Sequence, residues 1–142
     1  MSQIVQDILG IARCGTQYRS DALAPMGLKS CHASYLVQIC ACPGISQDQL
    51  AQKICINKSN VARQVVILEE GGFITRKPCD EDKRVMKLYP TEKTQQLLPE
   101  IISILNDWEA CLTQDLSPEE LALLGPLLER MKIRAVAWMD AR

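Results

Sequence analysis

The fold is decided by one segment, residues 46–89: SQDQLAQKICINKSNVARQVVILEEGGFITRKPCDEDKRVMKLY. Ser46 opens a capping box of the form Ser-x-x-Gln, in which two side chains satisfy free amides at the start of a helix. Asn57 is a good N-cap for a second helix at residues 58–70, and the glycines at 71–72 permit a left-handed C-cap. Two helices joined by a short turn predict a helix-turn-helix.

The second helix separates into an apolar face and a polar face. At about 100° per residue, Val61, Val65 and Leu68 share the side that we expect to be buried. The other side presents short polar groups and one arginine; in the major groove, arginine reads guanine, whereas Asn or Gln reads adenine. An ordinary solvated helix face is the alternative interpretation. The residues that we expect to contact DNA from this helix are Asn57, Lys58, Ser59, Asn60, Arg63 and Gln64.

Two strand-like segments follow, at residues 73–77 and 84–89, around a charged turn at residues 78–83. A charged hairpin directly after a recognition-like helix is typical of a wing. Basic wing residues can contact phosphates or the minor groove, and we expect Asp82 to orient Arg84 through an ion pair. The DNA-contacting residues that this segment predicts are Arg76, Lys77, Lys83 and Arg84.

These segments resemble the MarR (multiple antibiotic resistance regulator) family, and the resemblance extends from about Leu23 through the last helix. Its most specific element is the Asp-x-Arg of the wing, followed by a strand and by Thr91 at the start of the next helix. Pro90 and Thr94 depart from the family pattern, and these departures affect the expectation for the end of that strand. The resemblance implies a transcriptional regulator, most often a repressor. The residues that carry it are Leu50-Ala51, Asn57 to Val61, Leu68-Glu69, Gly72 to Ile74, Arg76, Asp82 to Arg84 and Thr91 to Lys93.

The rest of the chain is predicted to be helical, so we expect a mainly α fold in a single domain of residues 1–142. The winged helix-turn-helix lobe occupies residues 28–90, and residues 1–21 and 91–142 form a helical dimerisation region. These terminal helices are more apolar than a small winged helix can cover. The family implies a two-fold dimer, which presents two recognition helices to the half-sites of a palindromic operator. A compact monomeric helical bundle is the alternative.

The charge distribution suits a protein that offers DNA one face. The net charge of −1 argues against indiscriminate binding to polyanions, but nine Lys or Arg oppose six Asp or Glu between Lys53 and Lys93. No basic leader precedes an apolar run, and no apolar run approaches the roughly 20 residues that span a bilayer. We therefore expect a cytoplasmic homodimer that binds double-stranded DNA and no membrane.

A small-molecule effector is expected to bind in a crevice formed by the first, second and fifth helices. A ligand between the dimer helices and the winged helices could change the spacing of the two recognition helices. The residues that their position places in this crevice are Tyr18, His32, Tyr35 and Trp108.

Seven cysteines, an odd number, argue against a structural disulfide framework in a cytoplasmic chain. Cys40, Cys55 and Cys111 fall on or near apolar faces, and we expect them to be small buried hydrophobic residues. Cys79, beside the wing turn, is a hypothetical redox sensor. Neighbouring lysine ammonium groups favour its thiolate, and the carboxylates at residues 80–82 oppose it.

Neither a metal site nor an enzyme active site is expected. Cys40-x-Cys42 lacks the spacing of a typical zinc finger, and His32 is the only histidine. No Gly-rich phosphate loop, paired carboxylate or nucleophile–base pair suggests catalysis, and no cofactor is implied. We expect His32 to be a partly exposed helix residue. The alternative to a DNA-binding regulator is a winged-helix protein-interaction module without DNA binding, and the basic wing argues against that alternative.

Overall fold

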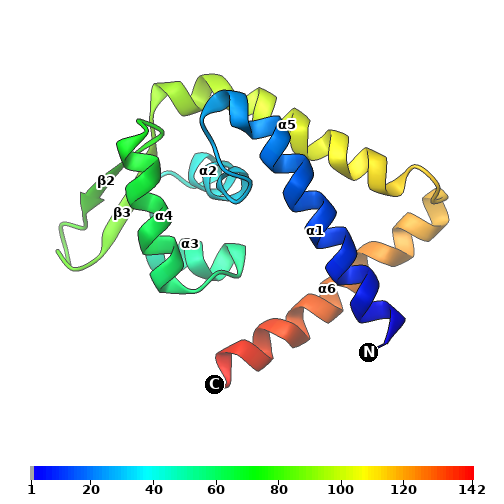
Figure 1. Ribbon diagram of the computed structural model, residues 1–142. Helices are drawn as coiled ribbons and strands as arrows, with labels where there is room; N and C mark the ends of the chain where they lie inside the picture. The colour runs from blue at the N-terminus through cyan, green and yellow to red at the C-terminus, as the bar shows by residue number, and fades with distance from the viewer. Residues whose placement is uncertain (1) are drawn as a thin grey trace. The chain divides into compact units, whose positions relative to one another are not determined.

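The described part of the chain is mainly helical. A computed structural model describes residues 2–142, so Met1, which the predicted domain includes, lies outside the described residues. The elements in Figure 1 are α1 (Gln3–Leu23), the 3₁₀ helix η1 (Ala24–Met26), α2 (His32–Ala41), β1 (Ile45–Ser46), α3 (Gln47–Ile54), α4 (Lys58–Glu70), β2 (Ile74–Pro78), β3 (Met86–Pro90), α5 (Glu92–Thr113) and α6 (Pro118–Asp140). The predicted mainly α winged helix-turn-helix with long N- and C-terminal helices is confirmed.

The chain divides into two compact units, one ending at Trp108 and the other formed by Glu109–Arg142. The first unit holds α1 through β3 and most of α5. The second holds the end of α5 and α6. Among residues 2–142, no helix has both the length and the apolar character that crossing a membrane requires.

Local capping explains where α3 and α4 begin. Ser46 Oγ accepts a hydrogen bond from the Gln49 amide, and Gln49 Oε1 accepts one from the Ser46 amide, each at 3.1 Å. Asn57 Oδ1 accepts from the Asn60 amide at 2.8 Å. Between the two helices, Cys55 makes the turn in the left-handed region with φ 57°. The predicted starts of both helices are therefore confirmed.

Hydrogen bonds tie the end of α4 to the start of α5. Gly71 stays in the right-handed region, and Gly72, with φ 79°, is the left-handed residue after the helix. The Thr91 hydroxyl donates to the Gly72 carbonyl and the Thr94 hydroxyl donates to the Phe73 carbonyl, both at 2.6 Å. Thr91 thus precedes α5 as expected, but its hydroxyl holds the segment that follows α4.

The wing belongs to a three-stranded antiparallel sheet in the order β1-β3-β2. Arg76 of β2 lies opposite Leu88 of β3, and Ile45 of β1 pairs with the same Leu88. The sequence predicts the two long strands one or two residues earlier than they occur. It does not predict β1, because a strand of two residues is too short to show alternation.

The core of the first unit buries the apolar face of α4. Val61 and Val65 are completely shielded from solvent, and Leu68 is 1% exposed. Burying an aliphatic side chain of this size contributes about 1.5–3 kcal/mol. The helix cannot turn its polar face inward without losing that contribution, so the polar face lies outward. The other large members of this core include Leu36, Ile39, Leu50, Ile74, Leu88 and Ile101.

Tyr35 provides a test of this core. Its side chain is fully buried, its hydroxyl has no hydrogen-bond partner among the described residues, and burial raises its pKa to about 12. A buried unsatisfied polar group costs about 1–3 kcal/mol. We predict that Tyr35→Phe raises the free energy of unfolding by about 1 kcal/mol, measured by urea denaturation. Tyr18→Phe is the matched control. A clear loss of stability in Tyr35→Phe would show that the hydroxyl is satisfied.

Candidate nucleic-acid interface

The outward face of α4 carries the predicted base-reading residues. Asn57, Lys58, Ser59 and Arg63 are exposed, and Asn60 is half-buried. The Asn57 oxygen is occupied, because it caps the helix and accepts from the Ser59 hydroxyl at 2.9 Å. Arg63 therefore provides the guanidinium that projects from the middle of this face, and Asn57 mainly fixes the start of the helix.

Lys58 lies at the N-terminal end of α4 beside Asp48 of α3. Their Nζ and Oδ2 atoms are 3.4 Å apart, and both side chains are about 70% exposed. Solvent screens an exposed pair of this kind, so it adds little stability. The Lys58 ammonium can therefore exchange this carboxylate for a phosphate at little cost.

Gln64 differs from the other predicted residues because its side chain is held by α2. Its Oε1 lies 2.8 Å from Nε2 of His32, and the residue is half-buried. His32 is only 1% exposed. The prediction of a partly exposed His32 is wrong, because helical spacing in α2 does not reveal that α4 covers this position. Gln64 is only partly available on the polar face.

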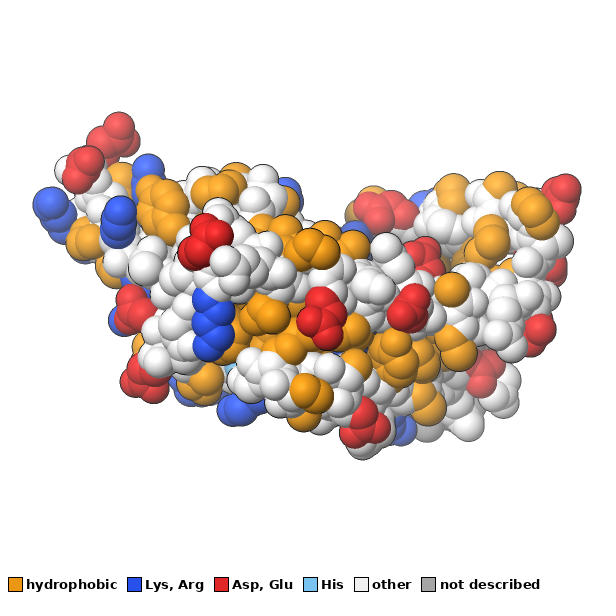
Figure 2. All heavy atoms as spheres, turned by 90° about the horizontal axis from the view of Figure 1, so that it is seen from above, with side chains coloured by type: hydrophobic (Ala, Val, Ile, Leu, Met, Phe, Trp, Pro, Cys, Tyr) orange, Lys and Arg blue, Asp and Glu red, His pale blue; other side chains and the backbone are white. Residues whose placement is uncertain are grey.

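The tip of the wing contains the predicted ion pair. Arg84 Nε lies 3.1 Å from Asp82 Oδ1, and Arg84 Nη2 lies 3.2 Å from Asp82 Oδ2. The Arg84 backbone amide also donates to Asp82 Oδ1, and these hydrogen bonds from Arg84 hold the pKa of Asp82 below its usual value. The Arg84 side chain remains 89% exposed. Figure 2 shows Lys or Arg side chains beside Asp or Glu side chains at this end of the molecule.

Arg76 is committed to an internal contact. Its Nε and Nη2 lie 3.1 and 3.0 Å from Glu69 Oε1, and its side chain is only 28% exposed. The hydrogen bond from Arg76 lowers the pKa of Glu69. This pair joins the last turn of α4 to β2, so Arg76 fixes the wing beside the helix and has less charge available for DNA than its position in the sequence suggests.

The other two predicted wing residues remain accessible. Lys77 and Lys83 are both exposed. The Lys77 ammonium lies 5.3 Å from the centre of the Tyr89 ring, which restrains it on the surface of the hairpin. Together with Arg84, these residues give the wing three exposed cations.

Two positioning residues escape sequence reasoning. Glu69 neutralises Arg76 across the bend between a helix and a strand, where no fixed spacing identifies partners. Lys93 donates to the Gly71 carbonyl at 3.0 Å, and its ammonium lies 4.2 Å from the centre of the Phe73 ring. The resemblance includes Glu69 and Lys93 as motif residues, but only the structure reveals what they contact.

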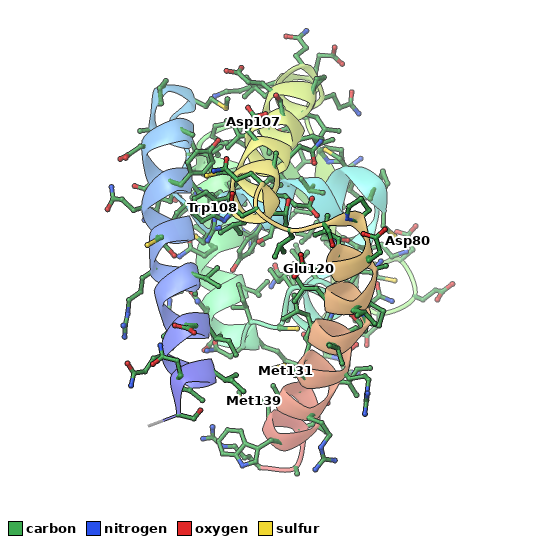
Figure 3. All side chains as sticks on the ribbon, turned by 90° about the vertical axis from the view of Figure 1, so that its right-hand side faces the viewer. Asp80, Asp107, Trp108, Glu120, Met131 and Met139 are labelled. Carbon is green, nitrogen blue, oxygen red and sulfur yellow. The ribbon has the colours of Figure 1, made fainter. Side chains whose placement is uncertain are left out.

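The structure divides the four predicted ligand-pocket residues into two pairs. Tyr18 stacks on Trp108, which Figure 3 labels, with ring centres 5.0 Å apart. His32 meets Tyr35 edge to face at 6.3 Å, and both are buried. Trp108 also packs on Gly15 of α1, where an added Cβ would lie 3.1 Å from the indole nitrogen. These side chains are packed against protein atoms, and their role in ligand binding stays a prediction.

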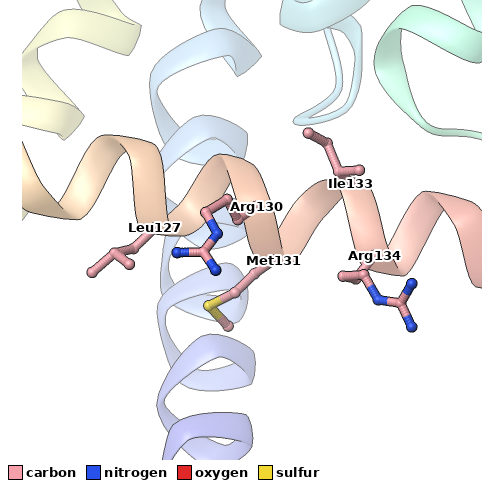
Figure 4. Close-up of a pocket in the computed structure, with 5 residues that line it drawn as sticks. All are labelled: Leu127, Arg130, Met131, Ile133 and Arg134. Atoms are coloured by element: carbon pink, nitrogen blue, oxygen red, sulfur yellow. The ribbon is translucent and has the colours of Figure 1, made fainter.

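A surface hollow on α6 does not provide a ligand site. Figure 4 shows that its lining residues, Leu127, Arg130, Met131, Ile133 and Arg134, all belong to α6. Residues of one helix cannot enclose a small molecule, because a binding pocket surrounds most of its ligand.

Every cysteine of the chain is a free thiol. Cys79 is half-buried, and its backbone amide donates to the Val85 carbonyl at 2.8 Å. The predicted burial is wrong for Cys55 and Cys111, which are exposed, and too strong for Cys40, which is half-buried. Cys55 occupies the left-handed turn after α3, which places its side chain outside the core. Within residues 2–142, no cluster of three His, Cys, Asp or Glu residues could hold a metal ion.

Comparisons with known proteins identify relatives of this arrangement. Residues 31–86 match the MarR family model. The uncharacterised HTH-type transcriptional regulator YybA of Bacillus subtilis (strain 168) is 34% identical over 99 residues, which cover 70% of this chain and 66% of YybA. The aligned segment therefore spans slightly less than two thirds of that relative.

Two solved structures are similar over nearly the whole chain. The transcriptional regulator SlyA superposes with a TM-score of 0.94 at 29% identity, covering 99% of this chain and 100% of that chain. A candidate MarR family transcriptional regulator from Listeria monocytogenes, complexed with a 26mer DNA, has a TM-score of 0.91 at 30% identity. That match covers 96% of this chain and 91% of the other.

The buried His32 predicts a pH dependence of stability. Burial lowers its pKa from 6.5. Between its folded and unfolded pKa values the unfolded state binds more protons, so the free energy of unfolding decreases as the pH falls below about 6.5. His32 is the only histidine, so His32→Gln should remove this component from urea denaturation curves measured at several pH values and equal protein concentration. Equal pH dependence in both proteins would show that His32 protonates freely in the folded state.

Proposed function

Since this chain belongs to the MarR family of transcriptional regulators, we propose that it is a homodimeric repressor that binds a palindromic double-stranded DNA operator. Proteins of this family are transcriptional regulators and not enzymes. The observation that carries the proposal is the outward polar face of α4, followed directly by a wing with an exposed, oriented Arg84. The DNA bound by the Listeria protein supports a DNA ligand for this chain.

The first half of α4 enters the major groove in this proposal. Arg63 is exposed opposite the buried Val61 and Val65, so its guanidinium can reach base edges without disturbing the core. A bidentate arginine contact to guanine discriminates against the wrong base by about 1–3 kcal/mol. Lys58 and Ser59 are exposed near the helix N-terminus and can contact phosphates there.

The wing contacts the backbone and the neighbouring minor groove. Asp82 holds the Arg84 guanidinium through two side-chain hydrogen bonds, which reduces the conformational freedom that Arg84 loses on binding. The Glu69–Arg76 pair fixes the base of the same hairpin to α4. Arg84 is therefore presented at a defined distance from the helix that reads the bases.

The homodimer is supported by uncovered apolar surface on the terminal helices. None of the residues of α6 is buried, and its exposed side chains include Leu123 at 67% and Trp138 at 65%. Figure 3 labels Met131 and Met139 along this helix. The N-terminal half of α1 exposes Ile4, Val5, Ile8, Leu9 and Ile11. Apolar patches of this kind mark interaction surfaces, and a second copy also supplies the second recognition helix for a palindrome.

Release from the operator by a small ligand or an oxidant completes the proposal, with the protein acting in the cytoplasm. The candidates for binding a small ligand are Tyr18 of α1, His32 and Tyr35 of α2, and Trp108 of α5. Cys79 is the candidate for responding to an oxidant. Cys79 lies beside the turn that carries Asp82 and Arg84, so its oxidation to sulfenic acid would alter the wing directly.

DNA binding is tested by fluorescence anisotropy with the DNA upstream of the protein's own gene and with duplexes selected from a random library. We predict that Arg63→Ala and Arg84→Ala each weaken binding about tenfold or more. Arg84→Ala should also reduce the dependence of log K on log salt by about one unit, because one phosphate contact is lost. Arg13→Ala, which removes an exposed charge from α1, is the control. Failure of the wild-type dimer to bind or select any duplex would contradict the proposal.

Redox release through Cys79 is tested with peroxide. If the Cys79 thiolate is the sensor, treatment releases DNA from the wild-type protein, and Cys79→Ser retains the complex. Cys14→Ser, which changes an exposed cysteine of α1, should respond as the wild type does. The measurement is a gel shift before and after treatment, with recovery by a thiol reductant. Release from oxidised Cys79→Ser would exclude this residue as the sensor.

A further inference from the structure

We infer that His32 is a positioning residue for base recognition, because its hydrogen bond turns the oxygen of Gln64 inward and leaves the amide N–H groups of Gln64 for DNA. The inference rests on the proposed function, since it requires α4 to bind in the major groove. The structural basis is a contact of 2.8 Å between Nε2 of a buried residue in α2 and Oε1 of Gln64 in α4.

The direction of this hydrogen bond follows from the other ring nitrogen. His32 Nδ1 lies 3.0 Å from the backbone amide of Lys29, and a backbone amide can only donate. In the neutral ring Nδ1 is therefore the acceptor, and the proton is on Nε2. Nε2 consequently donates, and the atom of Gln64 that faces it must be the oxygen. Burial favours the neutral ring by lowering the pKa of His32.

His32 cannot easily release this orientation. Its side chain is 1% exposed, both ring nitrogens have partners, and the ring meets the fully buried Tyr35 edge to face. Rotation of the imidazole would break the bond from the Lys29 amide and leave a buried ring nitrogen without a partner. A side chain held in one rotamer before binding loses less freedom when it binds.

The consequence is a change in what Gln64 can recognise. A free glutamine carboxamide reads adenine with both ends, accepting from N6 and donating to N7. In this structure the carboxamide oxygen of Gln64 faces His32 of α2, so only its two N–H donors remain available to DNA. Two donors match guanine, which presents the acceptors N7 and O6, or thymine, which presents O4, whereas adenine offers only N7 and places its N6 donor group beside it. We therefore assign to Gln64 a preference for guanine or thymine at its base pair, with His32 as the cause.

The test uses duplexes that the wild-type protein selects from a random double-stranded library. Each base pair of the selected site is replaced in turn, and binding is measured for wild type, Gln64→Leu, His32→Phe and the double variant. At one base pair, we expect Gln64→Leu to reduce the ratio of affinities for the selected and the replaced base by about tenfold. His32→Phe should flatten the same preference, the double variant should lose no more, and the salt dependence should stay unchanged.

Two further variants separate positioning from a structural role. His32→Gln retains an N–H donor near the position of Nε2 and should restore the preference. Gln64→Glu can accept from His32 but has no donor for DNA, so it should lose the preference. His32→Asn, whose shorter amide does not reach Gln64, replaces His32→Phe if circular dichroism shows that His32→Phe does not fold. A merely structural role would instead lower affinity evenly for all duplexes and would not be restored selectively.

The outcomes separate the two proposals. Failure of the wild-type protein to select any duplex overturns the proposed function. If the protein selects a site but Gln64→Leu leaves every base preference unchanged, the positioning role of His32 is overturned and the proposed function stands. The same conclusion follows if Gln64→Leu loses a base preference that His32→Phe retains. Selection of adenine at the Gln64-dependent position would overturn the preference assigned to Gln64, since N–H donors alone do not favour adenine over guanine.

Discussion

Burial of one face of α4 is the constraint on which the rest of the winged helix depends. Val61, Val65 and Leu68 enter the core of the first unit, and their burial fixes the rotation of the helix about its axis. Arg63 then has to project to solvent, and Gln64, between the two faces, is placed where α2 can reach it. One apolar stripe thus decides which polar groups are offered to DNA and which are drawn toward the interior.

Two arginine–carboxylate pairs of similar geometry serve the wing differently. Arg76 and Glu69 are largely covered and join secondary-structure elements, so their pairing acts mainly on the position of the hairpin. Arg84 and Asp82 are two residues apart at an exposed turn, where screening by water makes the pair weak. The Arg84 side chain stays 89% exposed beside Asp82, so its guanidinium can reach a phosphate while Asp82 orients it. The degree of burial therefore distinguishes a structural arginine from one that is free to bind.

The sequence predicts the helices and the wing well because their signals are local. Ser46 and Asn57 cap helices as their spacing predicts, and the Asp82–Arg84 pair joins residues two positions apart. The contacts that the sequence does not reveal join distant segments. The burial of His32 by α4 and the capture of Arg76 by Glu69 depend on how helices and strands pack. The exposure of Cys55 likewise follows from its left-handed turn and not from the hydrophobicity of its neighbours.

The carbonyl of Phe73 has a consequence for how the regulator can move. It accepts from the Thr91 amide at 3.1 Å and the Thr94 hydroxyl at 2.6 Å, while the Thr91 hydroxyl donates to the neighbouring Gly72 carbonyl at 2.6 Å. Lys93 adds a bond to the Gly71 carbonyl at 3.0 Å. The junction between α4 and β2 is thus fastened to the first turn of α5 and has no freedom to act as a hinge. Motion of this end of α5 has to carry the DNA-reading helix with it, so a signal that passes through α5 arrives as a displacement of the whole winged helix.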